Sequence, residues 1–167
     1  EEMTVLGDAL GGVGGARISA QDGATIRLEP TGVVTVMVGV GEQGQGTEGI
    51  FAQIAADVVG VPMSAIRVVT GDTDVTPYGG GTWASRGAGI GGEAVLQAGF
   101  ALRKNILSLA GVILKREAET LALRDAQIVD ASTGASVMAL NELGRIAYFR
   151  PDTLPAGVTG ELMVTRH

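Results

Sequence analysis

Two glycine-rich segments each join a predicted strand to a predicted helix. The first spans residues 39–47 (GVGEQGQGT) and the second spans residues 79–86 (GGGTWASR). Glycine lets the backbone approach a ligand closely, and the first turn of a helix exposes N–H groups without intrahelical partners. Two such loops could close on one anionic ligand from two sides. The pattern therefore favours a cradle for a cofactor, built where strands lead into helices.

The composition indicates one domain with an aliphatic core. The chain has 167 residues, of which 46% are hydrophobic and only 4% aromatic. This length predicts a single domain over residues 1–167, or one lobe excised from a larger subunit. The net charge of −6 disfavours nucleic acid and anionic membrane surfaces as partners, because both require a basic face.

The residue types limit metal binding and secretion. There is no cysteine, and the single histidine is His167, so we expect no metal site built from protein ligands. No apolar run reaches the ~18 residues of a membrane span. The acidic start, Glu1-Glu2-Met3, lacks the pattern of a signal peptide, which favours the cytoplasm of a bacterium over the periplasm.

Hydrophobic periodicity predicts an α+β fold. Short strands are expected at 16–20, 24–29 and 33–38, where turn signals separate them into an antiparallel meander. Two main helices are expected, at Thr47–Val59 and at about 86–116, with a buried strand at Ile66–Val69 between them. Farther along, we expect a helical turn within 118–123, a strand at 126–130, a helix from Ala139 and no regular element after Pro151. The prediction is a mixed sheet with two main helices packed on it.

The first loop also fits two other interpretations. Gly39, Gly41 and Gly44 match the GxGxxG pattern of a Rossmann-like dinucleotide-binding module, with Asp72 as a candidate ribose ligand. The preceding hairpins and the long spacing to Asp72 argue against that interpretation. Alternatively, the glycines only make turns. Glu42 and Glu48 flank the loop, and a solvated or helix-terminal role is favoured for them over general-base chemistry.

The side chains of the loops are suited to a phosphate-bearing ligand. The first loop offers neutral amides, and the second offers hydroxyls that can also cap a helix. Arg86 could bind phosphate through two parallel hydrogen bonds. Alternatively, Arg86 forms a surface ion pair with Asp72 or Asp74. Trp83, the only tryptophan, either fills the core beneath the loop or shields a cofactor.

Several motifs in a fixed order resemble a known family. Residues 41–48 (GEQGQGTE) are followed by 53–57 (QIAAD), 60–62 (GVP), 71–74 (GDTD) and 81–86 (GTWASR). This order resembles the molybdopterin-binding large subunit of the xanthine dehydrogenase and aldehyde oxidase family, most of all the large subunit of aerobic carbon monoxide dehydrogenases. The similarity covers residues 33–116 well and the flanks loosely.

The resemblance implies a molybdenum hydroxylase, which oxidises an aldehyde, an N-heterocycle or a CO-like substrate and passes electrons through iron–sulfur centres to FAD. It implies a molybdopterin cofactor, in bacteria often the cytosine dinucleotide form. The implied partners are the remainder of the molybdenum subunit, an iron–sulfur subunit or domain, and an FAD subunit or domain. The implied cofactor-binding residues are Gln43, Gly44, Gln45, Gly46, Thr47, Gly80, Gly81, Thr82, Trp83, Ala84, Ser85 and Arg86.

The chain departs from the family at the catalytic base. The family's catalytic glutamate lies in a Gly-Glu-Pro-Pro-like context, and Gly160-Glu161-Leu162 does not match it. We therefore expect no catalytic residue in this chain. The resemblance implies one lobe of a cofactor site, inactive by itself.

Overall fold

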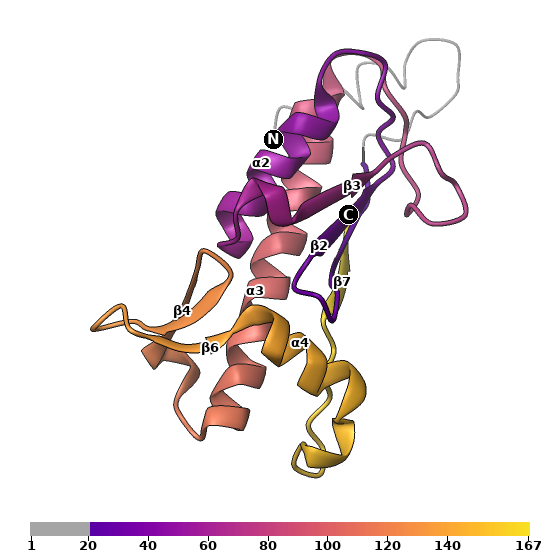
Figure 1. Ribbon diagram of the computed structural model, residues 1–167. Helices are drawn as coiled ribbons and strands as arrows, with labels where there is room; N and C mark the ends of the chain where they lie inside the picture. The colour runs from indigo at the N-terminus through magenta and orange to yellow at the C-terminus, as the bar shows by residue number, and fades with distance from the viewer. Residues whose placement is uncertain (1–20) are drawn as a thin grey trace.

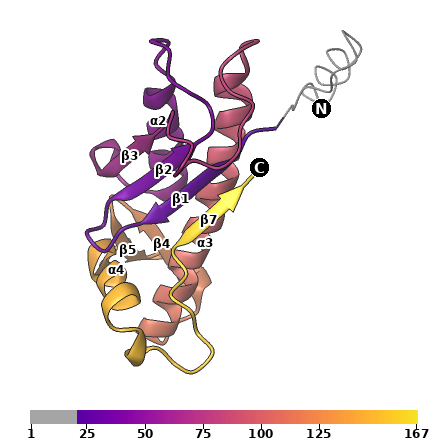
Figure 2. The same ribbon diagram turned by 90° about the vertical axis from the view of Figure 1, so that its right-hand side faces the viewer.

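A four-stranded mixed sheet forms the centre of the molecule. The structure is a computed structural model and describes residues 21–167, so the strand expected at 16–20 lies outside the described residues. The strands are β1 (Ala24–Leu28), β2 (Val34–Val38), β3 (Ile66–Val69) and β7 (Met163–Arg166), in the order β3-β2-β1-β7. β1 is antiparallel to both β2 and β7, whereas β2 and β3 are parallel (Figure 2).

Two long helices cover one face of this sheet. α2 (Thr47–Val59) contacts β2 and β3, and α3 (Gly92–Leu114) contacts β1 and β7. The helices also pack against each other, closely enough that a Cβ on Gly99 would lie 2.2 Å from Cγ1 of Val58. Aliphatic side chains from the strands and both helices fill the space between them, with Phe51 as the one aromatic residue of this core. Figure 1 shows α2 and α3 running side by side.

A second, smaller sheet lies beside the far end of α3. It consists of β4 (Leu121–Arg124), β5 (Gln127–Asp130) and β6 (Ser136–Ala139), all antiparallel, and helix α4 (Leu140–Phe149) follows directly (Figure 1). Short 3₁₀ turns occupy Met63–Ala65, Ala118–Thr120 and Pro151–Thr153. Across residues 21–167, no helix is long and apolar enough to cross a membrane.

The predicted fold class is confirmed, with corrections to individual elements. The bounds of α2 and β3 are as predicted, and the helix expected from Arg86 begins as a π-helical turn (Gly87–Gly91) before α3. The predictions missed β4, β6 and β7. The Rossmann alternative is wrong, because β1 is antiparallel to both of its neighbours, β2 and β7, whereas a Rossmann unit is built from parallel strands.

Candidate functional site

The two glycine-rich loops meet at one hollow. α2 and the π-helical turn that leads into α3 begin at the same end of the molecule (Figures 1 and 2). Between these starts lies an open hollow of about 370 Å³. Its lining residues come from both loops and the helix turns behind them: Gln43, Gln45, Thr47, Ile50, Thr82, Trp83, Ala84, Ser85, Arg86, Gly87 and Ala88.

Most of the predicted cofactor-binding residues line this hollow. The exceptions are glycines of the same loops, namely Gly44, Gly46, Gly80 and Gly81. Gly44, Gly46 and Gly81 have φ angles of 93°, 82° and 79°, which favour glycine, and a Cβ on any of them would meet open space. These three positions therefore leave room for a ligand to approach the backbone.

The carboxylate of Glu42 organises the first loop. Its Oε1 accepts the backbone N–H groups of Gln43, Gly44 and Gly46 at 3.1, 2.7 and 3.1 Å, and its Oε2 accepts the N–H of Glu48 at 3.0 Å. These hydrogen bonds hold the pKa of Glu42 below its usual range. The N–H of Glu48 has the largest effect, and the N–H groups of the loop have smaller ones. Glu42 thus has the helix-terminal role that the sequence favoured.

Gln45 also stabilises the first loop from within. Its Oε1 accepts the N–H of Gln43 at 2.6 Å, and its Nε2 donates to the carbonyl oxygen of Gly41 at 3.4 Å. With the Glu42 hydrogen bonds, these contacts hold the turn in one conformation. The loop therefore presents the neutral side chains of Gln43 and Gln45 to the hollow in a preorganised turn.

The second loop contains two consecutive residues in the left-handed region. Ala84 and Ser85 have φ angles of 49° and 57°, which cost free energy for residues with a Cβ. The indole N–H of Trp83 donates to the carbonyl oxygen of Gly80 at 2.9 Å, which closes the turn. Trp83 is partly exposed and lines the hollow, so it does not fill the core beneath the loop.

Arg86 is buried and paired with a residue that the sequence did not single out. Its Nη2 lies 2.8 Å from Oδ2 of Asp22, and the two residues are 3% and 1% exposed. Nη1 donates to the carbonyl oxygen of Gly81 and Nη2 to that of Gln21, each at 3.1 Å. The expected surface ion pair with Asp72 or Asp74 is corrected to a buried pair with Asp22.

Burial of Asp22 disfavours the charged form of its carboxylate. Desolvation raises its pKa, and the charge of Arg86 and the N–H of Gly80 partly offset that rise. Oδ1 accepts the Gly80 N–H at 2.7 Å, whereas Oδ2 is contacted by the guanidinium without a hydrogen bond of good geometry among the described residues. The positive charge of Arg86 therefore has a local counter-ion.

Sequence reasoning missed four residues of this region. Ile50, Gly87 and Ala88 line the hollow, and Asp22 pairs with Arg86. Ile50 follows the loop by one helical turn, a position that faces whatever binds at a helix start. Asp22 follows Gln21 in a segment that reads as a plain turn, so local sequence gives no signal for its distant partner.

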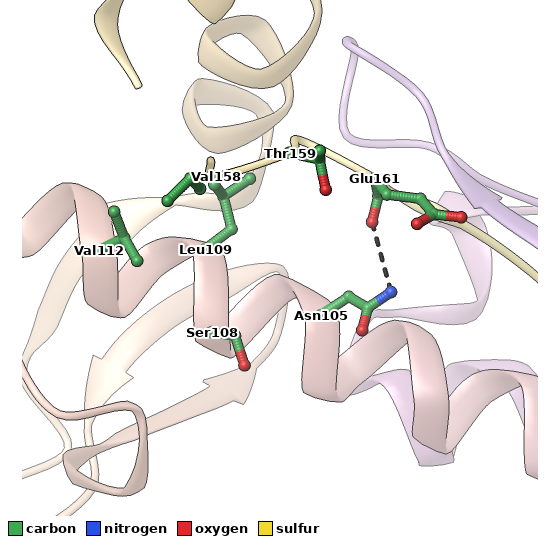
Figure 3. A pocket seen from close by; sticks show the side chains of 7 residues that line it. All are labelled: Asn105, Ser108, Leu109, Val112, Val158, Thr159 and Glu161. Carbon is green, nitrogen blue, oxygen red and sulfur yellow. Dashed lines mark hydrogen bonds between the residues drawn. The ribbon is translucent and has the colours of Figure 1, made fainter. Parts of the chain in front are cut away.

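A second hollow lies on α3 away from the loops. Its volume is about 190 Å³, and its lining residues are Asn105, Ser108, Leu109, Val112, Val158, Thr159 and Glu161 (Figure 3). The amide of Asn105 donates to the backbone carbonyl oxygen of Glu161 at 3.4 Å. The carboxylate of Glu161 disfavours a phosphate here, whereas no carboxylate lines the hollow between the loops.

The chemistry of the hollow between the loops fits a molybdopterin-type cofactor. Amide, hydroxyl and indole groups line it, the backbone is open to close approach at three glycines, and the one charged lining residue is a cation. Such groups can accommodate a phosphorylated, partly aromatic molecule. Within residues 21–167, no cluster of three histidine, cysteine or carboxylate side chains could hold a metal ion directly.

Comparison with known proteins identifies the family. The model of the molybdopterin cofactor-binding domain matches residues 4–165. The chain belongs to this family. It is 33% identical over 152 residues to the large subunit of nicotine 6-hydroxylase from Paenarthrobacter nicotinovorans, which covers 91% of this chain and 19% of that subunit. The predicted identity as a molybdopterin cofactor-binding domain is therefore confirmed.

Solved structures of two enzymes share the fold of this molybdopterin-binding domain. Quinoline 2-oxidoreductase from Pseudomonas putida 86 superposes with a TM-score of 0.79 at 40% identity. CO dehydrogenase from Oligotropha carboxidovorans superposes with a TM-score of 0.76 at 29% identity. Each alignment covers 87% of this chain and 18% of the other. The chain thus spans about a fifth of the length of the relatives it matches.

Proposed function

We propose that the hollow between the two loops holds the phosphate-bearing part of a molybdopterin cofactor. The observation that supports this most directly is the convergence of both loops on one hollow without a carboxylate in its lining. The family match supplies the cofactor class. We propose the cytosine dinucleotide form, because the chain resembles bacterial carbon monoxide dehydrogenases.

The loop residues would share the work of binding. Gln43, Gln45 and Thr47 would contact the end of the cofactor near the metal through neutral amide and hydroxyl groups. Ser85, with the backbone of Ala84, would donate to the phosphates, while Thr82 lines the site with its hydroxyl proton held by the carbonyl oxygen of Gly41. Trp83 would cover the bound molecule and exclude water. When bound, the cofactor supplies the redox chemistry of oxidative hydroxylation.

The whole enzyme would require more than this chain. We propose that the chain is one lobe, with residues 1–167 as a single domain, of a molybdenum subunit that acts with an iron–sulfur and an FAD subunit or domain. An aldehyde, an N-heterocycle or a CO-like molecule would be the substrate. The general base would come from elsewhere in the enzyme. A cytoplasmic location in a bacterium stays a prediction, which cell fractionation can check.

The hollow can be tested by adding negative charge to its lining. In the native enzyme that contains this chain, Ser85→Glu places a carboxylate in the proposed phosphate site, and Ser108→Glu places one in the second hollow as a control. We expect Ser85→Glu to lose molybdenum and pterin from the purified enzyme, because like charges repel in a partly desolvated site. Full cofactor content in Ser85→Glu, with its circular dichroism unchanged, would contradict the proposal.

A further inference from the structure

We propose that Arg86 is a positioning residue, which acts through a buried clasp with Asp22 and does not bind the cofactor's phosphate with a free charge. The clasp consists of Asp22, Gly80 and Arg86. It fixes the second loop against the chain segment that leads into β1. The contacts of the clasp are seen in the structure, while its consequence for cofactor binding rests on the proposed function.

The clasp combines a buried ion pair with hydrogen bonds to the backbone. Asp22 holds the backbone of Gly80 through one oxygen and the guanidinium through the other, at 2.7 and 2.8 Å. The guanidinium in turn donates to carbonyl oxygens on either side of the clasp, at Gln21 and Gly81. A buried ion pair with several hydrogen bonds fixes geometry, and removal of one partner leaves the other charge uncompensated.

Two glycines of the second loop are required by this clasp. A Cβ on Gly79 would lie 2.3 Å from Oδ1 of Asp22, and a Cβ on Gly80 would lie 2.1 Å from Nη1 of Arg86. Gly81 differs, because its Cβ would meet open space. The glycine run therefore serves two purposes: its first two members make room for the clasp, and the third allows the turn.

Further contacts extend the clasp to the sheet and to Trp83. Asp22 forms an isolated antiparallel bridge with Gly79, and the N–H of Gly23, next to β1, donates to the carbonyl oxygen of Tyr78 at 3.0 Å. The guanidinium of Arg86 lies 5.5 Å from the centre of the Trp83 ring, within cation–π range. These contacts hold the base of the loop in place while Ala84 and Ser85 adopt their left-handed conformations.

The clasp determines how much of the positive charge of Arg86 is available to a bound anion. Because Asp22 balances Arg86 inside the protein, the attraction for an anion comes from the hydroxyl and N–H groups that the clasp positions. Loss of Asp22 would then harm cofactor binding although it removes a negative charge. If Arg86 bound the phosphate directly, the opposite would be expected, because loss of Asp22 would free the positive charge of Arg86 for the phosphate.

The clasp is tested in the 167-residue chain by Asp22→Asn, Arg86→Gln and the double variant. The readouts are hydrogen exchange over residues 79–85 and the fluorescence of Trp83, the only tryptophan. Each single variant should exchange about tenfold faster or more in this segment, since each removes one charge of a buried ion pair and leaves the other charge uncompensated. The double variant should add little to either single change, because both act on one contact. Arg150→Gln, which removes an exposed ion pair with Asp152, is the control and should change neither readout.

The same substitutions in the native enzyme test the role toward the cofactor. The clasp predicts that Asp22→Asn and Arg86→Gln lose bound molybdenum and pterin to a similar extent. Cofactor retained in Asp22→Asn but lost in Arg86→Gln would overturn the positioning role, as would unchanged or additive exchange in the loop. Faster loop exchange with full cofactor content in both variants would uphold the clasp and contradict the proposed function instead. Should Arg86→Gln fail to fold, Asp22→Asn and Arg86→Lys carry the comparison.

Discussion

The side-chain hydroxyl of Thr82 donates to the backbone carbonyl oxygen of Gly41 and so joins the two glycine-rich loops directly. Each loop has its own internal support, the first from Glu42 and the second from Arg86. The hydrogen bond between Thr82 and Gly41 links these two loops. It therefore helps to set the width of the hollow between them.

Replacement of Thr82 should weaken this link. Thr82→Val keeps the shape of the side chain but removes the donor, so the free energy of unfolding should fall by about 1 kcal/mol. Urea denaturation followed by circular dichroism measures the change. Thr82→Ser keeps the hydroxyl and serves as the control. A Thr82→Val variant as stable as Thr82→Ser would show that the hydrogen bond contributes nothing.

Glu42 should titrate at an unusually low pH. Hydrogen bonds from the loop N–H groups favour its charged form, so the pKa lies below the ordinary value of 4.5. In NMR spectra, the amide protons of Gly44 and Gly46 should follow this titration, because both donate to Oε1. Glu42→Gln should abolish the inflection, whereas Glu48→Gln should preserve it. An inflection at or above the ordinary pKa would refute the role of the loop amides.

Gly99 should be intolerant of a larger side chain. Gly99→Ala places a methyl group against Val58 between α2 and α3, so we expect a loss of about 1–3 kcal/mol in unfolding free energy. Combination with Val58→Ala should recover part of the loss, since it removes the clashing methyl groups. Gly49→Ala, on α2 and facing open space, is the control. It should raise stability by about 0.5–1 kcal/mol through helix propensity. Equal effects at the two positions would disprove the packing explanation.

Asp130 should make stability depend on pH in the acidic range. The Ser132 hydroxyl, then Arg116, then the N–H groups of Thr133 and Ser132 hold the pKa of Asp130 well below its ordinary value of 3.8. A lowered native pKa gives stability that is complete above the unfolded-state value and is lost as the pH falls through the native value.

Denaturation of Asp130→Asn at several pH values tests this dependence. The wild-type advantage over Asp130→Asn should be present at pH 6 and shrink as the pH falls below 3.8. Asp152→Asn, which removes an exposed ion pair, is the matched control and should change the free energy of unfolding little. An advantage of the same size at pH 6 and at pH 2.5 would contradict the assignment.

The parts of the fold that local signals determine were predictable from sequence. Gly60 and Pro62 mark the end of α2, and the β-branched run at 33–38 marks β2. β7 was missed, because its strand state depends on pairing with β1, which lies far away in the sequence. β6 was missed and its last residue, Ala139, was assigned to the predicted helix, since a short strand that runs directly into α4 has no turn signal to separate the two.

In the candidate site, too, the features with local sequence signals were predictable and those that depend on distant contacts were not. Glycine patterns and hydroxyl residues located both loops, since these features act over a few residues. The partner of Arg86 could not be located, because nothing near Asp22 in sequence distinguishes it from Asp72 or Asp74 as a counter-ion. Glu42 lies within the predicted loop, but its acceptance of four N–H groups depends on the folded turn.

The position of β7 beside β1 affects how this domain can form during translation. β1 and β2 leave the ribosome long before β7, so the neighbour that pairs with the other side of β1 is made only when Met163–Arg166 is synthesised. Until then β1 presents an open hydrogen-bonding edge, which invites pairing with other nascent chains. Shielding of that edge, by a chaperone or by adjoining polypeptide, would therefore matter most in the interval before the last strand emerges.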